Sequence, residues 1–296
     1  MFSYFSGLQT DSTGDGQDGL HLMWSEDGFK WEALNQGNSF LKPMAGKNKL
    51  MRDPCIIQGP DDLFHMVWTV SWEEPAIGYA NSKNLIEWSE QKTIVPFDES
   101  DNARNCWAPE ITYDPEHDHF MIYWSTTIPG KFPETDSSNI KGRNHRTYYT
   151  LTKDFESFSP TQMLYDPGFN SIDAVIYPHE GRWVMFIKDE SRYPEVQKNL
   201  KMAWSDNLTG PYSPASEPFS QHWVEGPTAT KVGSLWYLYY DEYPTDKHDD
   251  FLIGLKLSHD LVHWEDVMDL LQLPPGVRHG TVFKVKESIL ENLKKL

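Results

Sequence analysis

The chain has 296 residues, of which 39% are hydrophobic and 14% aromatic, which is enough for a large buried core. The formal net charge is −18, which argues against nucleic acid as a partner because binding to a duplex depends on neutralising phosphates. No stretch approaches the about 18 consecutive apolar residues of a membrane span, and no signal peptide precedes the first strand, so we expect no membrane insertion and leave the compartment unknown.

The first elements along the chain read as β-strands. Residues 2–6 form an aromatic strand, and residues 20–31 hold a strand, a polar turn and a second strand that ends in an aromatic residue. A closely similar phrase returns at residues 77–88 and again at residues 253–264. This recurrence indicates an internal repeat.

A second phrase, in which a polar or acidic residue leads into an apolar strand, occurs five times. Successive copies start 54, 65, 53 and 54 residues apart, at Arg52, Cys106, Ser171, Val224 and Arg278. Each of the first four copies is followed by a turn rich in Gly, Pro or Asp and by a strand with aromatic residues. These second strands lie at residues 64–70, 120–126, 183–189 and 236–242.

Four strands per repeat of this length predict the blade of a β-propeller. The fifth copy has only its opening strand, at residues 281–285, and its other strands are supplied by residues 2–6 and 20–31. We therefore expect an all-β fold, a single five-bladed β-propeller over residues 1–296 whose ring is closed by the N- and C-terminal strands. Residues 286–296 have apolar side chains at helical spacing and predict a short C-terminal helix.

The long polar connections all fall on one face of such a propeller, at residues 8–19, 71–76, 127–145, 191–199 and 243–250. The five phrases start at the same face, so we expect one axial pocket to collect Asp53, Glu110, Asp173, Glu225 and His279. Carboxyl groups crowded in a partly dry pocket push their pKa values apart. Glycoside hydrolysis requires such a pair, one carboxyl protonated and one ionised.

Three motifs resemble those of glycoside hydrolase family 43, whose members are inverting five-bladed propellers acting mostly on arabinose- and xylose-containing glycans. They are Arg52-Asp53-Pro54, Ser171-Ile172-Asp173-Ala174 and Val224-Glu225-Gly226-Pro227. The resemblance implies that Asp53 is the general base, that Glu225 is the general acid, and that Asp173 raises the pKa of Glu225 and orients it. It also implies that His279 holds water or a calcium ion, although a core histidine is an equal alternative. Arg52 replaces the family's usual histidine, and Glu110 replaces its usual aspartate.

Further residues are expected to bind the sugar. Trp72, Trp107 and Trp223 fall at the loop-bearing face, where sugar rings stack well on aromatic rings. Lys188 and Arg278 are expected to contact sugar hydroxyls, and Glu110 is either a sugar ligand or a buried structural carboxylate. No cofactor is required for the reaction, and an axial Ca²⁺ is the one metal considered.

These features together predict an inverting, exo-acting glycosidase. The expected substrate is a terminal α-L-arabinofuranosyl group on plant-type polysaccharides or oligosaccharides. Two alternatives remain: the same machinery acting on β-xylosyl or β-galactosyl ends, and a non-catalytic propeller that binds glycan or protein. A binding module has no need of three axial carboxylates, which favours the enzyme. Nothing in the sequence indicates an obligate protein partner.

Overall fold

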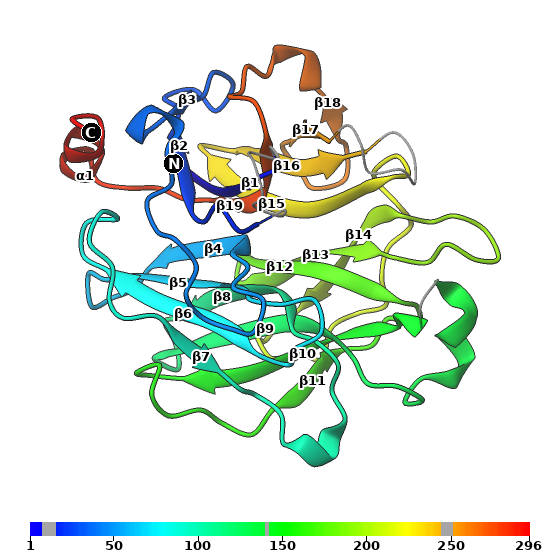
Figure 1. Ribbon diagram of the computed structural model, residues 1–296. Helices are drawn as coiled ribbons and strands as arrows, with labels where there is room; N and C mark the ends of the chain where they lie inside the picture. Colours follow the sequence, from blue (N-terminus) through cyan, green and yellow to red (C-terminus); the bar gives the residue numbers. More distant parts are fainter. Residues whose placement is uncertain (8–15, 140–141, 244–250) are drawn as a thin grey trace.

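The computed structural model describes residues 1–7, 16–139, 142–243 and 251–296, and in these ranges most of the regular structure is β-strand (Figure 1). The strands form five antiparallel sheets. The innermost strands contact one another in a closed ring, with β4 against β8, β8 against β12, β12 against β15, β15 against β19, and β19 against β4. The predicted five-bladed β-propeller is confirmed.

Each blade is described from its inner to its outer strand. Blade 1 contains β4 (Arg52–Gln58), β5 (Phe64–Thr69), β6 (Ile77–Ser82) and β7 (Lys92–Ile94). Blade 2 contains β8 (Trp107–Asp114), β9 (His119–Thr127), β10 (His145–Thr152) and β11 (Gln162–Tyr165). Blade 3 contains β12 (Ser171–His179), β13 (Arg182–Asp189) and β14 (Asn199–Ser205). Blade 4 contains β15 (Val224–Val232), β16 (Leu235–Glu242), β17 (Leu252–Ser258) and β18 (Glu265–Asp266).

Blade 5 takes strands from both ends of the chain, as predicted. It contains β19 (Val277–Val282), β1 (Phe2–Ser6), β2 (His21–Trp24) and β3 (Glu32–Ala33). Phe2 lies opposite Val282 and Tyr4 lies opposite Gly280, so the first and last strands are neighbours in one sheet. Short 3-10 turns occur in the connections, at Asn35–Gly37, Glu99–Asp101, Pro133–Ser138 and Met268–Leu270.

Blade 3 differs from the prediction because its sheet has three strands instead of four. Proline has no amide hydrogen, so Pro214 and Pro218 interrupt the ladder that a fourth strand would form. Serine hydroxyls accept hydrogen bonds from the β14 amides at distances of 3.1, 3.0 and 2.8 Å, in the pairs Trp204–Ser213, Met202–Ser216 and Leu200–Ser220. The segment therefore covers the edge of the blade without being a regular strand.

A β-bulge interrupts each inner strand close to its start. The pairing with the neighbouring strand shifts at the same place in all five blades. The equivalent bulge residues are Asp53, Ala108, Asp173, Gly226 and His279. The first four have positive φ values of 52°, 44°, 55° and 57°. Positive φ costs a non-glycine residue about 1–3 kcal/mol, so the surrounding structure must hold these bulges in place.

Hydrogen bonds between blades supply part of that support. Along the axis, a side chain of one blade accepts a hydrogen bond from a backbone amide of the next. The donor–acceptor distances are 3.4, 2.9, 2.8 and 3.0 Å, in the pairs Ile111–Cys55, Ile176–Tyr123, Ala229–Tyr177 and Val282–Thr228. We call these contacts the axial latches. Because each one satisfies a buried amide, the latches fix the rotation of neighbouring blades about the axis.

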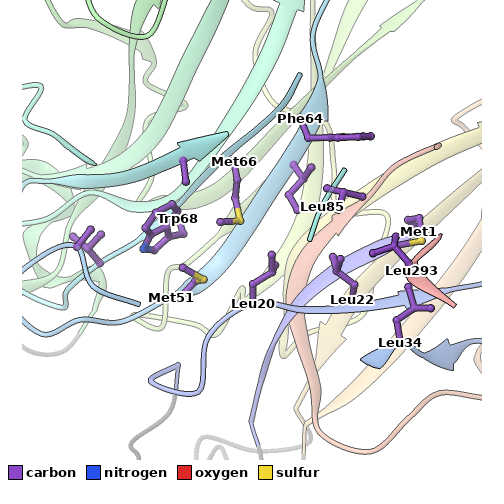
Figure 2. Close-up of a cluster of buried hydrophobic side chains, with 14 of the residues drawn as sticks. Met1, Leu20, Leu22, Leu34, Met51, Phe64, Met66, Trp68, Leu85 and Leu293 are labelled. Atoms are coloured by element: carbon purple, nitrogen blue, oxygen red, sulfur yellow. The ribbon is translucent and has the colours of Figure 1, made fainter. Parts of the chain in front are cut away.

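The predicted C-terminal helix is present as α1 (Glu287–Leu293). Its Leu293 is fully buried beside Met1, Leu22 and Leu34, in a hydrophobic cluster that also includes blade 1 (Figure 2). The helix therefore seals the seam between the blade formed by the chain ends and its neighbour. None of the helices within the described ranges combines the length and the hydropathy needed to cross a bilayer.

Candidate active site

Asp53 lies at the bulge of β4 and is 9% exposed. Its Oδ2 accepts a hydrogen bond from the Thr69 hydroxyl at 2.8 Å, and its Oδ1 lies 3.3 Å from Nδ1 of His279. Burial alone would raise the pKa of Asp53, but the hydrogen bond and charge of His279 outweigh burial, and Arg52 and Thr69 act in the same direction. The pKa of Asp53 is lowered as a result, so this carboxylate is ionised and suited to accept a proton.

Asp173 occupies the equivalent bulge two blades away. Its Oδ2 accepts a hydrogen bond from the Gly226 amide at 3.0 Å, which joins blade 3 to blade 4. Burial and the negative charges of Glu225 and Asp53 raise the pKa of Asp173 to about 6, with His279 and Lys188 opposing them. Asp173 is therefore the member of the site that exchanges its proton closest to neutral pH.

Gly226 allows the three blades to meet at this point. A β-carbon on Gly226 would lie 2.5 Å from the imidazole ring of His279, and its φ of 57° is a conformation that glycine adopts freely. The His279 ring thus lies between Asp53 and Gly226, while the Gly226 amide holds Asp173. These contacts bring Asp53, Asp173 and Glu225 together at one end of the axis.

Glu225 precedes this glycine in β15 and keeps an 18% exposed side chain. Its Oε2 lies 2.7 Å from Nζ of Lys188, and its Oε1 lies 3.6 Å from a guanidinium nitrogen of Arg278. Burial favours protonation, but Lys188 and Arg278 outweigh burial and lower the pKa of Glu225. We expected Asp173 to raise the pKa of Glu225. That expectation is wrong, because Lys188 and Arg278 lie close to Glu225 and their positive charges dominate its pKa.

His279 does not have the properties of a metal ligand. Burial opposes its charge, but the hydrogen bond and charge of Asp53, together with Asp173 and Asp241, raise the pKa of His279 to about 10. A protonated imidazole has no lone pair for a metal. Moreover, no group of three or more His, Cys, Asp or Glu side chains in the described parts of the chain could hold a metal ion. The described side chains around His279 therefore supply no set of metal ligands of their own, and the calcium ion stays a prediction.

Glu110 does not lie level with the other carboxyls. The bulge register shows that Ala108 is the equivalent of Asp53, so Glu110 lies two residues further along its strand. It is 6% exposed, and its Oε1 accepts a hydrogen bond from the Thr281 hydroxyl at 3.4 Å. Burial raises the pKa of Glu110 to about 7, with Cys55 and Thr281 among the groups that oppose it.

A cavity of about 250 Å³ begins at Glu110 and is lined by later residues of the inner strands, including Gln58, Thr112 and Tyr177, and by Lys284 just beyond β19. Gln58, Thr112 and Tyr177 lie toward the ends of their strands, away from Asp53 at the start of β4. The expected ring of five groups in one pocket is therefore wrong for Glu110. Of the two readings of this residue, the structure favours the buried structural carboxylate.

Two of the predicted tryptophans form one side of the site. The rings of Trp72 and Trp107 pack edge to face with centroids 5.6 Å apart, and Trp72 is 41% exposed. The Arg52 guanidinium stacks on Trp72 at 4.5 Å, and the Arg143 guanidinium stacks on Trp107 at 4.3 Å. Trp223 lies on the opposite side, between blades 3 and 4, and packs on Tyr243 with centroids 5.9 Å apart.

Ion pairs join the loops that carry these tryptophans. Glu73 accepts hydrogen bonds from Arg104 at 2.7 and 3.2 Å and also pairs with Arg143, while the Trp72 carbonyl accepts from Trp107 at 3.2 Å. We call this group, formed by Trp72, Glu73, Arg104, Trp107 and Arg143, the tryptophan wall. The predicted long connections at residues 8–19, 127–145 and 243–250 lie partly outside the described residues.

Lys188 and Arg278 have other roles than those expected. Lys188 is fully buried; its ammonium donates hydrogen bonds to Glu225 at 2.7 Å and to the Tyr243 hydroxyl at 2.8 Å, and it lies 2.6 Å from the Glu190 carboxylate. The expected direct contact between Lys188 and a sugar is therefore wrong. Arg278 is 6% exposed, and its Nε donates to Asp241 at 2.7 Å.

Sequence reasoning missed Thr69, Glu190, Asp241 and Tyr243, all of which support the predicted residues. Thr69, Asp241 and Tyr243 lie at or just beyond the ends of second strands, opposite the starts of the inner strands. Polar residues at the ends of otherwise aromatic strands were the signal that could have found them.

The arrangement combines one ionised carboxylate, Asp53, with a coupled pair of carboxyls, Asp173 and Glu225. The set can take a proton from water at one point and give a proton at another. That is the requirement for cleaving a glycosidic bond with a water molecule.

Comparison with known proteins points to the same chemistry. A family model described as a probable glycosyl hydrolase domain, related to glycoside hydrolase family 43, matches residues 1–291. An α-L-arabinofuranosidase from Bifidobacterium longum subsp. longum is 22% identical over an alignment of 241 positions that covers 71% of this chain and 22% of that protein. The chain thus spans about a fifth of the length of that relative.

Solved structures with similar folds include an α-L-arabinanase from Cellvibrio cellulosa complexed with arabinohexaose. It has a TM-score of 0.62 and 13% identity, with 90% of this chain and 93% of that chain covered. An α-L-arabinofuranosidase from Lactobacillus brevis has a TM-score of 0.57 and 17% identity, with 74% and 72% covered. These likenesses agree with the propeller fold. Because the family model covers nearly the whole chain, the protein belongs to the glycoside hydrolase 43-related family.

Proposed function

We propose that the protein is an inverting, exo-acting glycosidase that removes terminal α-L-arabinofuranosyl groups from plant-type polysaccharides or oligosaccharides. The observation that carries the proposal is the convergence of Asp53, Asp173 and Glu225 at one end of the axis in different charge states. An inverting reaction needs one ionised carboxylate and one carboxylic acid on opposite sides of the sugar.

In this scheme Asp53 takes a proton from a water molecule as the water oxygen bonds to the anomeric carbon. The glycosidic bond breaks at the same time, and its oxygen receives a proton from Glu225. Asp173 exchanges protons with Glu225, and His279 keeps Asp53 ionised and oriented. The remaining requirement is a closed pocket that excludes other water.

The tryptophan wall supports the exo mode of action. It closes one side of the site by joining residues 72–73 to Arg104, Trp107 and Arg143 through hydrogen bonds and stacked guanidinium groups. A closed side favours a pocket for one terminal sugar over an open groove for a long chain. The choice of α-L-arabinofuranose is supported by the Bifidobacterium longum relative, which is an α-L-arabinofuranosidase.

The first experiment measures hydrolysis of 4-nitrophenyl α-L-arabinofuranoside, β-D-xyloside and β-D-galactoside by the wild type, with the product anomer followed by ¹H NMR. We expect hydrolysis of the arabinofuranoside with inversion. Retention of configuration would reject the inverting scheme. Binding of an arabinan oligosaccharide without hydrolysis would reject the enzyme and favour the binding module. Hydrolysis of the xyloside or galactoside alone would keep the proposed mechanism and replace only the assigned terminal sugar.

Substitutions then test the residues. Asp53→Asn and Glu225→Gln should each abolish hydrolysis while the far-UV circular dichroism spectrum shows that the propeller stays folded. Asp118→Asn is a matched control, because it removes a carboxylate whose side chain is 76% exposed, in the turn between β8 and β9. Full activity in either of the first two variants would overturn the assigned roles.

A further inference from the structure

Six buried or nearly buried charges alternate in sign beside the site. Each lies next to its neighbours in the order Lys198, Glu190, Lys188, Glu225, Arg278 and Asp241. We call this series the charge ladder. The shortest nitrogen–oxygen distances in its last four steps are 2.6, 2.7, 3.6 and 2.7 Å. Its side chains are at most 18% exposed, so solvent screens these interactions little.

The ladder is electrically neutral, since it has three cations and three anions. Asp53 and His279 form a further neutral pair. Asp173 differs from all of these groups. Within the described ranges, no Lys, Arg or His side chain forms an ion pair with it, and the hydrogen bond that its carboxylate accepts comes from the Gly226 amide. The geometry therefore leaves Asp173 as the site carboxyl that carries a proton most readily, which agrees with its raised pKa.

Glu225 must nevertheless be protonated when the leaving group departs. Adding a proton to Glu225 removes one counterion of Lys188, and a buried ammonium without a counterion costs several kcal/mol. Lys188 has a second carboxylate in reach, Glu190 at 2.6 Å, and a neutral acceptor in the Tyr243 hydroxyl at 2.8 Å. Lys188 can thus stay charged and hydrogen-bonded whichever protonation state Glu225 adopts.

Binding of the sugar would favour protonation of Glu225. The Glu225 side chain is 18% exposed, and a sugar that fills the pocket replaces the water around it. Loss of water favours the neutral form of a carboxyl group. The proton is available nearby, because the Gly226 amide ties the Asp173 carboxyl to the residue that follows Glu225.

Building on the proposed function, we propose that Lys188 is a positioning residue that lets a proton pass from Asp173 to Glu225 when sugar occupies the pocket, with Glu190 serving as its alternative counterion. Asp173 loses the proton and Glu225 gains it. Glu225 then gives it to the glycosidic oxygen as the bond to the anomeric carbon breaks, and Asp53 takes a proton from the attacking water. After product release, Asp53 loses its proton to solvent and Asp173 regains one.

Two substitutions on the ladder should act in opposite directions. Lys188→Met removes the cation that ionises Glu225, so the titration midpoint of Glu225 should rise by about 1–3 pH units. Lys188 also lowers the pKa of Asp173, so the basic limb of the kcat/KM profile, which follows loss of the proton that Asp173 passes to Glu225, should move to higher pH as well. Glu190→Gln leaves Glu225 as the remaining carboxylate partner of Lys188, so that limb should move down by about one unit. Glu190→Gln should also slow substrates with poor leaving groups more than nitrophenyl glycosides.

The midpoint of Glu225 is read by ¹³C NMR of carboxyl-labelled glutamate, with Glu225→Gln to assign the signal, so this measurement does not depend on hydrolysis. Lys188→Arg keeps the charge and should restore the wild-type titration. Lys201→Met is the matched control, since it breaks a similar buried pair, Lys201 with Asp189 at 2.8 Å, outside the ladder. It should move neither the Glu225 midpoint nor the pH profile.

An unchanged Glu225 midpoint in Lys188→Met would overturn the inference. So would a shift of the basic limb in the same direction in Lys188→Met and Glu190→Gln, because a merely structural role predicts equal damage. If the wild type hydrolyses no glycoside, the proposed function and the proton transfer both fail. The NMR titration would then still show whether Lys188 sets the charge of Glu225, which separates the two failures.

Discussion

The Asp53–His279 pair makes the stability of the protein depend on pH in a range where few other groups titrate. His279 is 5% exposed and belongs to the only ion pair that the described residues form with Asp53. Replacing it by glutamine keeps a polar side chain but removes the charge. The perturbation therefore tests whether His279 is protonated in the folded protein.

The sign and size of the change in unfolding free energy with pH follow from the shift in the pKa of His279. The pKa of His279 rises from an unfolded value of 6.5 to about 10 in the folded protein. A raised pKa contributes stability that is present in full below pH 6.5 and is lost as pH rises through about 10. The loss amounts to about 1.36 kcal/mol per pH unit within this window. Between pH 7 and 9.5, the stability of the wild type relative to His279→Gln should fall by about 3 kcal/mol.

The assay is urea denaturation of both proteins at half-unit steps from pH 7 to 9.5, with the difference in unfolding free energy plotted against pH. Taking the difference cancels the titration of groups that the two proteins share. His65→Gln is the matched control, because His65 is also buried and lies 3.2 Å from a carboxylate, that of Asp61. Burial lowers the pKa of His65, so it is neutral throughout this range and its variant should run parallel to the wild type.

Parallel curves for the wild type and His279→Gln would refute the reasoning, because they would mean that the imidazole is already neutral at pH 7. Asp53→Asn provides an independent check. It removes the hydrogen-bonded counterion, so it should flatten the same slope while leaving the imidazole in place.

Three further predictions concern packing and binding. Gly226→Ala should destabilise the protein by about 1–3 kcal/mol in urea denaturation, because the added β-carbon would lie 2.5 Å from the axial imidazole. The control is Gly233→Ala, which has a φ of 62° but no atom within 4 Å of the added β-carbon. Its free energy of unfolding should fall only by the cost of the positive φ, about 1–2 kcal/mol. Tyr177→Phe should cost about 1–3 kcal/mol, since it leaves the Ala229 amide of an axial latch without an acceptor, and equal unfolding midpoints would contradict this. Trp72→Ala should raise KM by about 3- to 10-fold with kcat nearly unchanged, if its ring stacks on bound sugar.

The blade pattern could be predicted because its signals are local. Aromatic and β-branched runs bounded by turn residues recur at nearly constant spacing, and the first four inner strands begin within one residue of the expected positions, as at Arg52 and Ser171. The fifth, β19, begins at Val277, four residues before the expected strand at residues 281–285. The missing fourth strand of blade 3 could also have been predicted, because Pro214 and Pro218 cannot donate to a ladder.

The position of each inner-strand side chain along the propeller axis could not be predicted in the same way. A bulge in each inner strand adds a residue. Matching the repeats by their acidic residues makes Glu110 the equivalent of Asp53, whereas matching them by the bulge makes Ala108 the equivalent. A shift of this kind moves a side chain from one end of the axis toward the other. Only the pairing with the second strand reveals it, because the bulge is defined by that pairing.

The sequence alone determined the five-bladed architecture, its closure by the two chain ends and the acidic residues Asp53, Asp173 and Glu225, because each depends on a motif a few residues long. The tertiary structure decided the order in which these carboxyls titrate, with the pKa of Asp173 raised and those of Asp53 and Glu225 lowered. Lys188, Glu225 and Arg278 come from three different blades and meet only when the ring closes. Charge states depend on distances between such groups, and those distances are a property of the fold.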